Sequence, residues 1–131
     1  MIVVDTSAVL AALTSGSTAD ALRRRLSEDM DLHAPHLIDV ELLHALRRLV
    51  SGRVLTNVRA MQARTDFAEL SVVRYSHELL SDRIWELRNN LSAYDAAFVA
   101  LSEALMVPLA TCDAKLAAAP AHRAQVELFQ G

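Results

Sequence analysis

Short strand-like segments alternate with helix-like segments along nearly the whole of this 131-residue chain. The first strand is the apolar run Met1-Ile2-Val3-Val4, and Val9, Leu10 and Leu13 then recur at helical spacing. Strand followed by helix is the unit from which parallel sheets are built, because the crossover helix returns the chain to the start of the next strand. The alternation therefore predicts an α/β fold, with a central parallel sheet between two layers of helices.

The same periodicities place the remaining elements. Further strands are expected at residues 32–34, 70–73, 108–111 and 126–129. Helices are expected at residues 18–30, 37–50, 53–67, 77–89, 92–105 and 113–119. No linker between these elements is long enough to divide the chain, so residues 1–131 are expected to form a single domain.

The composition indicates a cytoplasmic protein that is not embedded in a membrane. Cys112 is the only cysteine, so neither a disulfide within the chain nor a cysteine-based zinc site is expected. The N-terminal residues lack the pattern of a secretory signal. Hydrophobic residues make up 53% of the chain, yet no apolar run approaches the roughly 18 residues of a membrane span. The excess apolar surface is expected to meet another protein.

The net charge of −3 argues against a protein that binds nucleic acid through bulk positive charge. It does not exclude a nuclease with a carboxylate site. Divalent cations bound among carboxylates offset the local negative charge and allow a phosphate to approach.

Four acidic residues are expected to meet at one edge of the sheet. Asp5 and Asp113 each follow a strand, and ligands of parallel α/β sheets bind beyond the carboxyl ends of the strands. A helix that leads into the next parallel strand runs back against it, so the helices that contain Glu41 and Asp95 begin at this same edge.

Each of these acids also has a purely structural interpretation. Asp5 and Asp113 are suited to cap helices, Ser92 and Asp95 have the spacing of a capping box, and Glu41 suits a surface position near a helix start. Glu41 and Asp95 nevertheless border apolar helix stripes. Carboxylates crowded in a partly buried site must be protonated, paired or bound to metal.

Oxygen ligands without cysteine or histidine favour Mg²⁺ or Mn²⁺ over zinc. Such ions activate water and offset charge on the leaving oxygen when a phosphodiester is hydrolysed. Ser7 and Thr111, at the same edge, are candidates to hold a water or a phosphate oxygen, although hydroxyls near strand ends are more often helix caps.

Four segments together resemble the PIN-domain family, and more narrowly its VapC-type toxins. They are Val4-Asp5-Thr6-Ser7-Ala8, the central Glu41, Leu91-Ser92-Ala93-Tyr94-Asp95-Ala96-Ala97 and Thr111-Cys112-Asp113-Ala114-Lys115-Leu116. The resemblance covers essentially the whole chain.

The resemblance implies a Rossmann-like α/β/α sandwich and an Mg²⁺- or Mn²⁺-dependent endoribonuclease that is the toxin of a VapBC-type toxin–antitoxin system. It implies structured RNA as substrate, a VapB-type antitoxin as partner, and homodimers. Family roles carry over to Asp5, Glu41, Asp95 and Asp113 as metal-site acids, with Thr6, Ser7 and Thr111 as supporting polar residues. Some PIN domains have a further acid one turn after the third; this chain has Val99 there, which puts a second, firmly held metal ion in doubt.

Two other functions remain open at this point. A haloacid-dehalogenase-like phosphatase also begins with a strand and an aspartate, but its general acid lies two residues later, where this chain has Ser7. A non-catalytic PIN-like binding module would lack one of the metal-site acids. Trp85 borders an apolar helix stripe and is expected to pack inward, and no histidine has convincing ligand spacing.

Overall fold

The computed structural model describes residues 1–29 and 31–130, and its centre is a five-stranded sheet in which all neighbouring strands are parallel. The strand order is β3-β2-β1-β4-β5. The strands are β1 (Ile2–Val4), β2 (Leu32–Pro35), β3 (Val72–Tyr75), β4 (Leu109–Thr111) and β5 (Val126–Leu128). The parallel sheet predicted from the alternation is confirmed.

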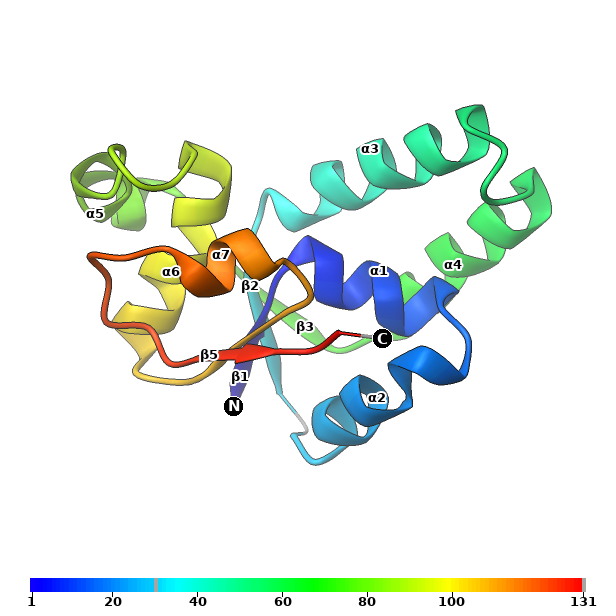
Figure 1. Ribbon diagram of the computed structural model, residues 1–131, viewed down its shortest axis with the longest axis horizontal. Helices are drawn as coiled ribbons and strands as arrows, with labels where there is room; N and C mark the ends of the chain where they lie inside the picture. Colours follow the sequence, from blue (N-terminus) through cyan, green and yellow to red (C-terminus); the bar gives the residue numbers. More distant parts are fainter. Residues whose placement is uncertain (30, 131) are drawn as a thin grey trace.

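Helices lie on both faces of the sheet, so the expected α/β/α sandwich is also confirmed (Figure 1). Two short 3₁₀ turns, Ser17–Ala19 and Glu78–Leu80, precede α2 and α5. The helices are α1 (Thr6–Thr14), α2 (Asp20–Ser27), α3 (Ile38–Ser51), α4 (Asn57–Glu69), α5 (Ser81–Glu86), α6 (Ala93–Leu105) and α7 (Ala114–Ala118). Among residues 1–29 and 31–130, no helix is both long and apolar enough to cross a membrane.

The strand order changes direction between β1 and β4. The chain first builds the sheet outward from β1 through β2 to β3, then returns to the other side of β1 to add β4 and β5. Because right-handed crossovers are strongly preferred, helices from the two halves cover opposite faces. The loops after β1 and β4 consequently diverge and leave a crevice at this end of the sheet, which is the usual ligand site of open α/β sheets.

The hydrophobic core lies between the central strands and helices α1, α3 and α6. All three residues of β1 are fully buried, as are Leu109 and Ala110 of β4. Seven consecutive residues of α6, Ala96–Ser102, are buried because that helix packs against β1, β2 and β4. This burial fixes the ends of β1, β4 and α6, from which site residues extend.

Two predicted boundaries in the middle of the chain were wrong. The helix expected at residues 53–67 begins at Asn57, because Arg53 has a positive φ of 59° and Thr56 caps the helix by accepting the Arg59 N–H at 3.2 Å. The strand expected at residues 70–73 is Val72–Tyr75. Its register against β2, with Val73 opposite His33, extends to Tyr75, whose hydroxyl lies 2.7 Å from Nδ1 of His33.

The two helices that follow turns are shorter than expected. The helix expected at residues 18–30 starts as a 3₁₀ turn and continues as α2 to Ser27; its expected end at Met30 lies outside the described residues. The helix expected at residues 77–89 is likewise a 3₁₀ turn followed by the short α5. The expectation that Trp85 packs inward was wrong: its side chain is 67% exposed, on the outer side of α5, with the Arg88 guanidinium 4.4 Å from its ring centroid.

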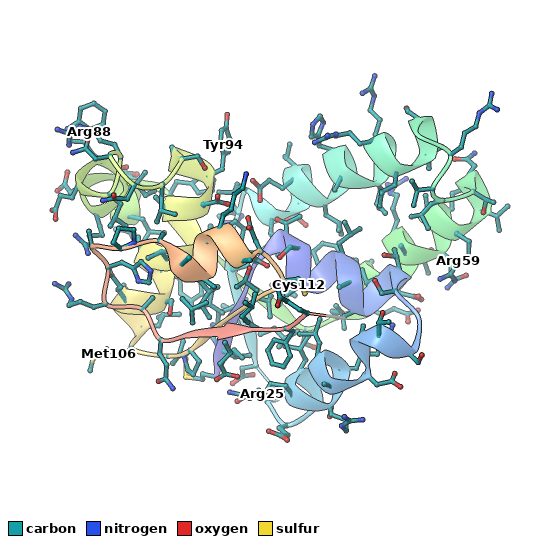
Figure 2. The ribbon with its side chains drawn as sticks, in the orientation of Figure 1. Arg25, Arg59, Arg88, Tyr94, Met106 and Cys112 are labelled. Carbon is teal, nitrogen blue, oxygen red and sulfur yellow. The ribbon has the colours of Figure 1, made fainter. Side chains whose placement is uncertain are left out.

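Two arginines connect elements that are distant in the sequence. Arg25 of α2 donates from Nε to Glu127 of β5 at 2.8 Å (Figure 2). Arg83 of α5 donates to both carboxylate oxygens of Glu103 on α6, at 2.7 and 3.0 Å. The Arg123 N–H also donates to Glu103, at 2.6 Å, and the Glu103 side chain is only 5% exposed. These hydrogen bonds lower the pKa of Glu103, with the Arg83 contact contributing most.

We predict that Arg83→Ala lowers the free energy of unfolding by about 2 kcal/mol at pH 7, because it leaves the Glu103 carboxylate without its charged partner. Since the pKa of Glu103 is lowered in the folded state, its contribution is present above the unfolded-state pKa of about 4.3 and is lost as the pH falls through the folded-state value. Urea unfolding of both proteins between pH 7 and pH 3 measures this difference. Arg59→Ala, at an exposed position, is the control; equal losses for the two variants would contradict the prediction.

Candidate active site

The candidate site lies in the crevice beyond the carboxyl ends of β1 and β4. Asp5 directly follows β1, and Asp113 lies two residues after the end of β4. The two strands pair through Val4 and Ala110, so their ends are held side by side. The sheet therefore brings together two acids that are more than a hundred residues apart in the sequence.

Asp5 is the most buried of the acids, with 5% of its surface exposed. Its Oδ1 accepts hydrogen bonds from Ser7 Oγ at 2.7 Å and from the Ala8 N–H at 2.9 Å, so Asp5 also caps α1. Its Oδ2 accepts a hydrogen bond from Thr111 Oγ1 at 2.5 Å. Burial raises the pKa of Asp5, the hydrogen bonds from Thr111, Ala8 and Ser7 lower it, and the charge of Asp95 raises it further.

Glu41 reaches the same crevice from α3. It lies in the first turn of that helix, and its Oε1 accepts a hydrogen bond from Thr6 Oγ1 at 2.5 Å, so the carboxylate points toward α1 and not into solvent. Burial raises the pKa of Glu41 most; the Thr6 hydrogen bond lowers it, and the charges of Asp95 and Asp5 raise it.

Asp95 and Asp113 complete the acidic set from the other side. The helix cap at α6 is Ser92, whose hydroxyl accepts the backbone N–H of Asp95 at 3.2 Å. Burial raises the pKa of Asp95, the charge of Asp113 raises it further, and hydrogen bonding with Ser92 lowers it. Asp113 caps α7, since its carboxylate accepts the Lys115 N–H at 2.9 Å.

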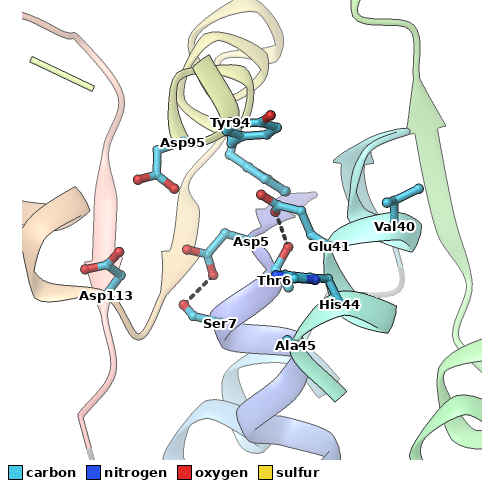
Figure 3. A pocket seen from close by; sticks show the side chains of 11 residues that line it. Asp5, Thr6, Ser7, Val40, Glu41, His44, Ala45, Tyr94, Asp95 and Asp113 are labelled. Carbon is cyan, nitrogen blue, oxygen red and sulfur yellow. Dashed lines mark hydrogen bonds between the residues drawn. The ribbon is translucent and has the colours of Figure 1, made fainter. Parts of the chain in front are cut away.

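One pocket of about 570 Å³ is lined by all four acids, and Figure 3 shows them around it. Thr6 and Ser7 also line it, whereas Thr111 lies behind Asp5. No lysine or arginine occurs among the described residues that line this pocket. The acids therefore repel one another without a lysine or arginine in the described pocket lining to offset them, which agrees with the raised pKa values of Asp5, Glu41 and Asp95.

The predicted supporting hydroxyls contact carboxylates in the structure. Thr6 holds Glu41, while Ser7 and Thr111 both hold Asp5 and lie 3.3 Å apart. Ser7 Oγ also accepts the Cys112 N–H at 2.9 Å, and this bond ties the start of α1 to the loop after β4. The hydroxyls thus orient the acids; that one of them also holds a water or phosphate oxygen stays a prediction.

Comparison with known proteins assigns the family. The family model described as PIN domain matches residues 2–121. The chain belongs to the PIN-domain family. Within it the chain groups with VapC ribonucleases: it is 47% identical to one from Mycobacterium bovis over 88% of both chains. It is also 43% identical to ribonuclease VapC1 of Mycobacterium tuberculosis, over 98% of this chain and 97% of that one.

A solved structure has the same fold. The crystal structure of VapC20 from Mycobacterium tuberculosis, described as a toxin that cleaves the sarcin-ricin loop, matches with a TM-score of 0.66 at 18% identity. The match covers 90% of this chain and 94% of that one. At this low identity the likeness concerns the fold, which it supports independently of the sequence relatives.

The residues of this PIN domain suit a divalent cation in donor type and in charge. The pocket offers carboxylate oxygens, which Mg²⁺ and Mn²⁺ prefer, and none of its described lining residues is lysine or arginine. Within residues 1–29 and 31–130, however, no three His, Cys, Asp or Glu side chains stand close enough together to hold an ion as placed. To hold one ion jointly, three or more of these carboxylates would have to turn toward one another. Val99 is fully buried in the core, so it leaves the pocket without the further acid of some family members.

Five pocket residues were not predicted from the sequence: Val40, His44, Ala45, Tyr94 and Phe98. His44 lies one turn after Glu41, and Tyr94 directly precedes Asp95. Their nearness to acidic residues in the sequence was the signal that could have identified them as pocket residues. That signal was weak, because such spacing also occurs on helix faces that never line a site.

We predict that Asp95→Asn is neutral or stabilising in EDTA, because it removes one of several crowded negative charges and keeps the Ser92 cap on the backbone N–H. Because the pKa of Asp95 is raised, any gain is largest at neutral pH and disappears below the unfolded-state value of about 3.9. The wild type should gain about 1.4 kcal/mol from about 10 mM Mg²⁺ if the dissociation constant is about 1 mM, and Asp95→Asn should gain less.

Thermal or urea unfolding with EDTA and with Mg²⁺ measures both effects. Asp82→Asn, in the first turn of α5 and outside the pocket, is the matched control. Equal stabilisation of wild type and Asp95→Asn by Mg²⁺ would show that Asp95 is not an important ligand.

Proposed function

We propose that this chain is the toxin of a VapBC-type system and an Mg²⁺- or Mn²⁺-dependent endoribonuclease. The observation that carries the proposal is the pocket into which separate elements bring Asp5, Glu41, Asp95 and Asp113 with no lysine or arginine beside them. The relatives are named ribonucleases, and they align over most of their length. Phosphodiester hydrolysis is the reaction for which such a carboxylate set, once it holds a divalent ion, is suited.

The four acids would hold the ion, which when bound supplies a Lewis acid that activates water and stabilises the leaving oxygen. The protein's own part is to fix the ligands before the substrate arrives. Asp5 is held from both oxygens by Ser7, Ala8 and Thr111, so it is the ligand with least freedom. Among the described residues only Thr6 donates to the Glu41 carboxylate, so Glu41 has more freedom to move toward a bound ion.

The alternatives are less well supported by the pocket. A non-catalytic PIN-like module would lack a metal-site acid, whereas all four line this pocket. A haloacid-dehalogenase-like phosphatase would need a carboxylic general acid at position 7, but this chain has Ser7 there, whose hydroxyl donates a hydrogen bond to Asp5. The family match and these contacts together favour the nuclease.

We predict that Asp5→Asn, Glu41→Gln, Asp95→Asn and Asp113→Asn each lower RNA cleavage by about a hundredfold or more, with the fold retained by circular dichroism. Thr111→Val should lower it by about 10–100-fold, because it releases Asp5 Oδ2. EDTA should abolish cleavage, and added Mg²⁺ or Mn²⁺ should restore it. Sequencing of RNA 5′ ends after induction locates the cleaved bonds; full activity in EDTA would exclude the metal mechanism.

The proposed protein partner is a VapB-type antitoxin, with homodimers as the resting form in the cytoplasm. Large apolar side chains are exposed along α3, α4 and the segment between them: Val40, Leu43, Val54, Val58 and Met61. Patches of this kind mark surfaces that bind other proteins. These exposed side chains agree with the high hydrophobic fraction of the sequence, which is 53%.

We predict that the chain sediments as a dimer or larger species at tens of micromolar, and that it copurifies with the product of the neighbouring gene when the two are co-expressed. Leu43→Asp combined with Met61→Asp should abolish copurification, because a charge in an apolar interface is left unpaired. Arg59→Asp, an exposed change on α4 outside this apolar set, is the control. A strict monomer that recovers no partner would argue against this assignment.

A further inference from the structure

Beside its acids, the pocket has apolar side chains that the proposed chemistry does not use. They are Tyr94 and Phe98 of α6 and Val40 and Ala45 of α3. Tyr94 and Phe98 lie one helical turn apart and so share a face. Phe98 is buried, at 1% exposure, whereas Tyr94 is 65% and Val40 72% exposed. Figure 3 shows Tyr94 on the α6 side of the pocket and Val40 on the α3 side, with Glu41 beside them.

The exposure of Tyr94 is not explained by packing. Its side chain does not belong to the hydrophobic core or to the residues packed against it, and in Figure 2 it projects away from α6. The equally exposed Trp85 differs in that the Arg88 guanidinium contacts its ring, at 4.4 Å from the centroid. The Ser92 cap fixes the backbone of the first turn of α6, on which Tyr94 lies. The fold thus presents an exposed aromatic ring next to Asp95.

The charge of the pocket limits how RNA can be held there. None of the described lining residues is lysine or arginine, so the pocket lacks the side chains that usually bind the phosphates of RNA. An uncharged contact to a base avoids this limitation. Aromatic rings supply such contacts to unstacked bases, and one stacked base commonly changes affinity by about tenfold.

We propose that Tyr94 stacks against the nucleobase next to the cleaved bond and thereby positions the phosphate at the acids. The inference rests on the proposed ribonuclease function. Tyr94 lines the same pocket as the four acids, so a base on its ring and a phosphate at the carboxylates can belong to neighbouring nucleotides of one RNA. The base contact supplies substrate affinity, and the acids supply the chemistry.

The test pairs the protein change with a substrate change. Cleavage is measured on an RNA of about 12 nucleotides that contains a mapped cleavage site, and on copies with an abasic ribose on one or the other side of the cleaved bond. Tyr94→Ala should lower kcat/KM about tenfold on the intact RNA, mainly through KM, and Tyr94→Phe should retain it. On the abasic RNA that lacks the stacked base, wild type and Tyr94→Ala should have equal kcat/KM, because the ring then has no base to contact. Trp85→Ala, at an equally exposed aromatic outside the pocket, should behave as wild type.

The inference is overturned if Tyr94→Ala loses the same factor on both abasic RNAs, because the ring then acts on Asp95 and not on a base. It is also overturned if Tyr94→Ala matches wild type on the intact RNA. A binding measurement separates it from the proposed function: fluorescence anisotropy of a fluorescein-labelled random RNA of about 12 nucleotides with Asp5→Asn proteins. Tyr94→Ala in that background should bind about tenfold more weakly than Trp85→Ala does, whether or not the wild type cleaves; equal affinities would refute the base contact.

Discussion

The buried carboxylate of Asp5 is the group around which this end of the molecule is organised. A carboxylate with 5% exposure needs hydrogen-bond donors, and it finds them in Ser7, the Ala8 N–H and Thr111. Thr111 ends β4 and lies 106 residues away along the chain. The pairing of β1 with β4 is therefore also the step that completes the surroundings of Asp5, so the sheet and the candidate site form together.

The remaining acids add charge that the folded chain alone does not neutralise. Burial and mutual repulsion raise the pKa values of Glu41 and Asp95, and the pocket has no lysine or arginine to offset them. A divalent ion would relieve this repulsion. Binding of the proposed catalytic metal would therefore also raise the free energy of unfolding. The apolar side chains of the pocket, with Tyr94 among them, then give the substrate a contact that does not depend on charge. A protein with a net charge of −3 can hold RNA in this way.

Most of the fold could be predicted from local patterns. Apolar runs and helical spacing located all five strands within about two residues, because burial of strands and helix stripes leaves a periodic trace in the sequence. The errors occurred where contacts between distant parts of the chain set the bounds of an element or the exposure of a side chain. The bounds of β3 depend on its pairing with β2, as in the contact of Tyr75 with His33. Trp85 lies on the exposed side of α5, which its place beside an apolar stripe does not reveal.

For the site, the sequence by itself was enough to predict that the four acids meet at one edge of the sheet. Strand ends and helix starts are local features, and parallel strands end at a shared edge. The sequence also determined that Asp5 and Asp113 suit helix caps, and both are caps in the structure. Only the tertiary structure decided that Thr6 holds Glu41, that Thr111 holds Asp5, and that Tyr94 and Val40 line the pocket. Those relations join side chains from separate elements, and their distances are set by how the helices pack on the sheet.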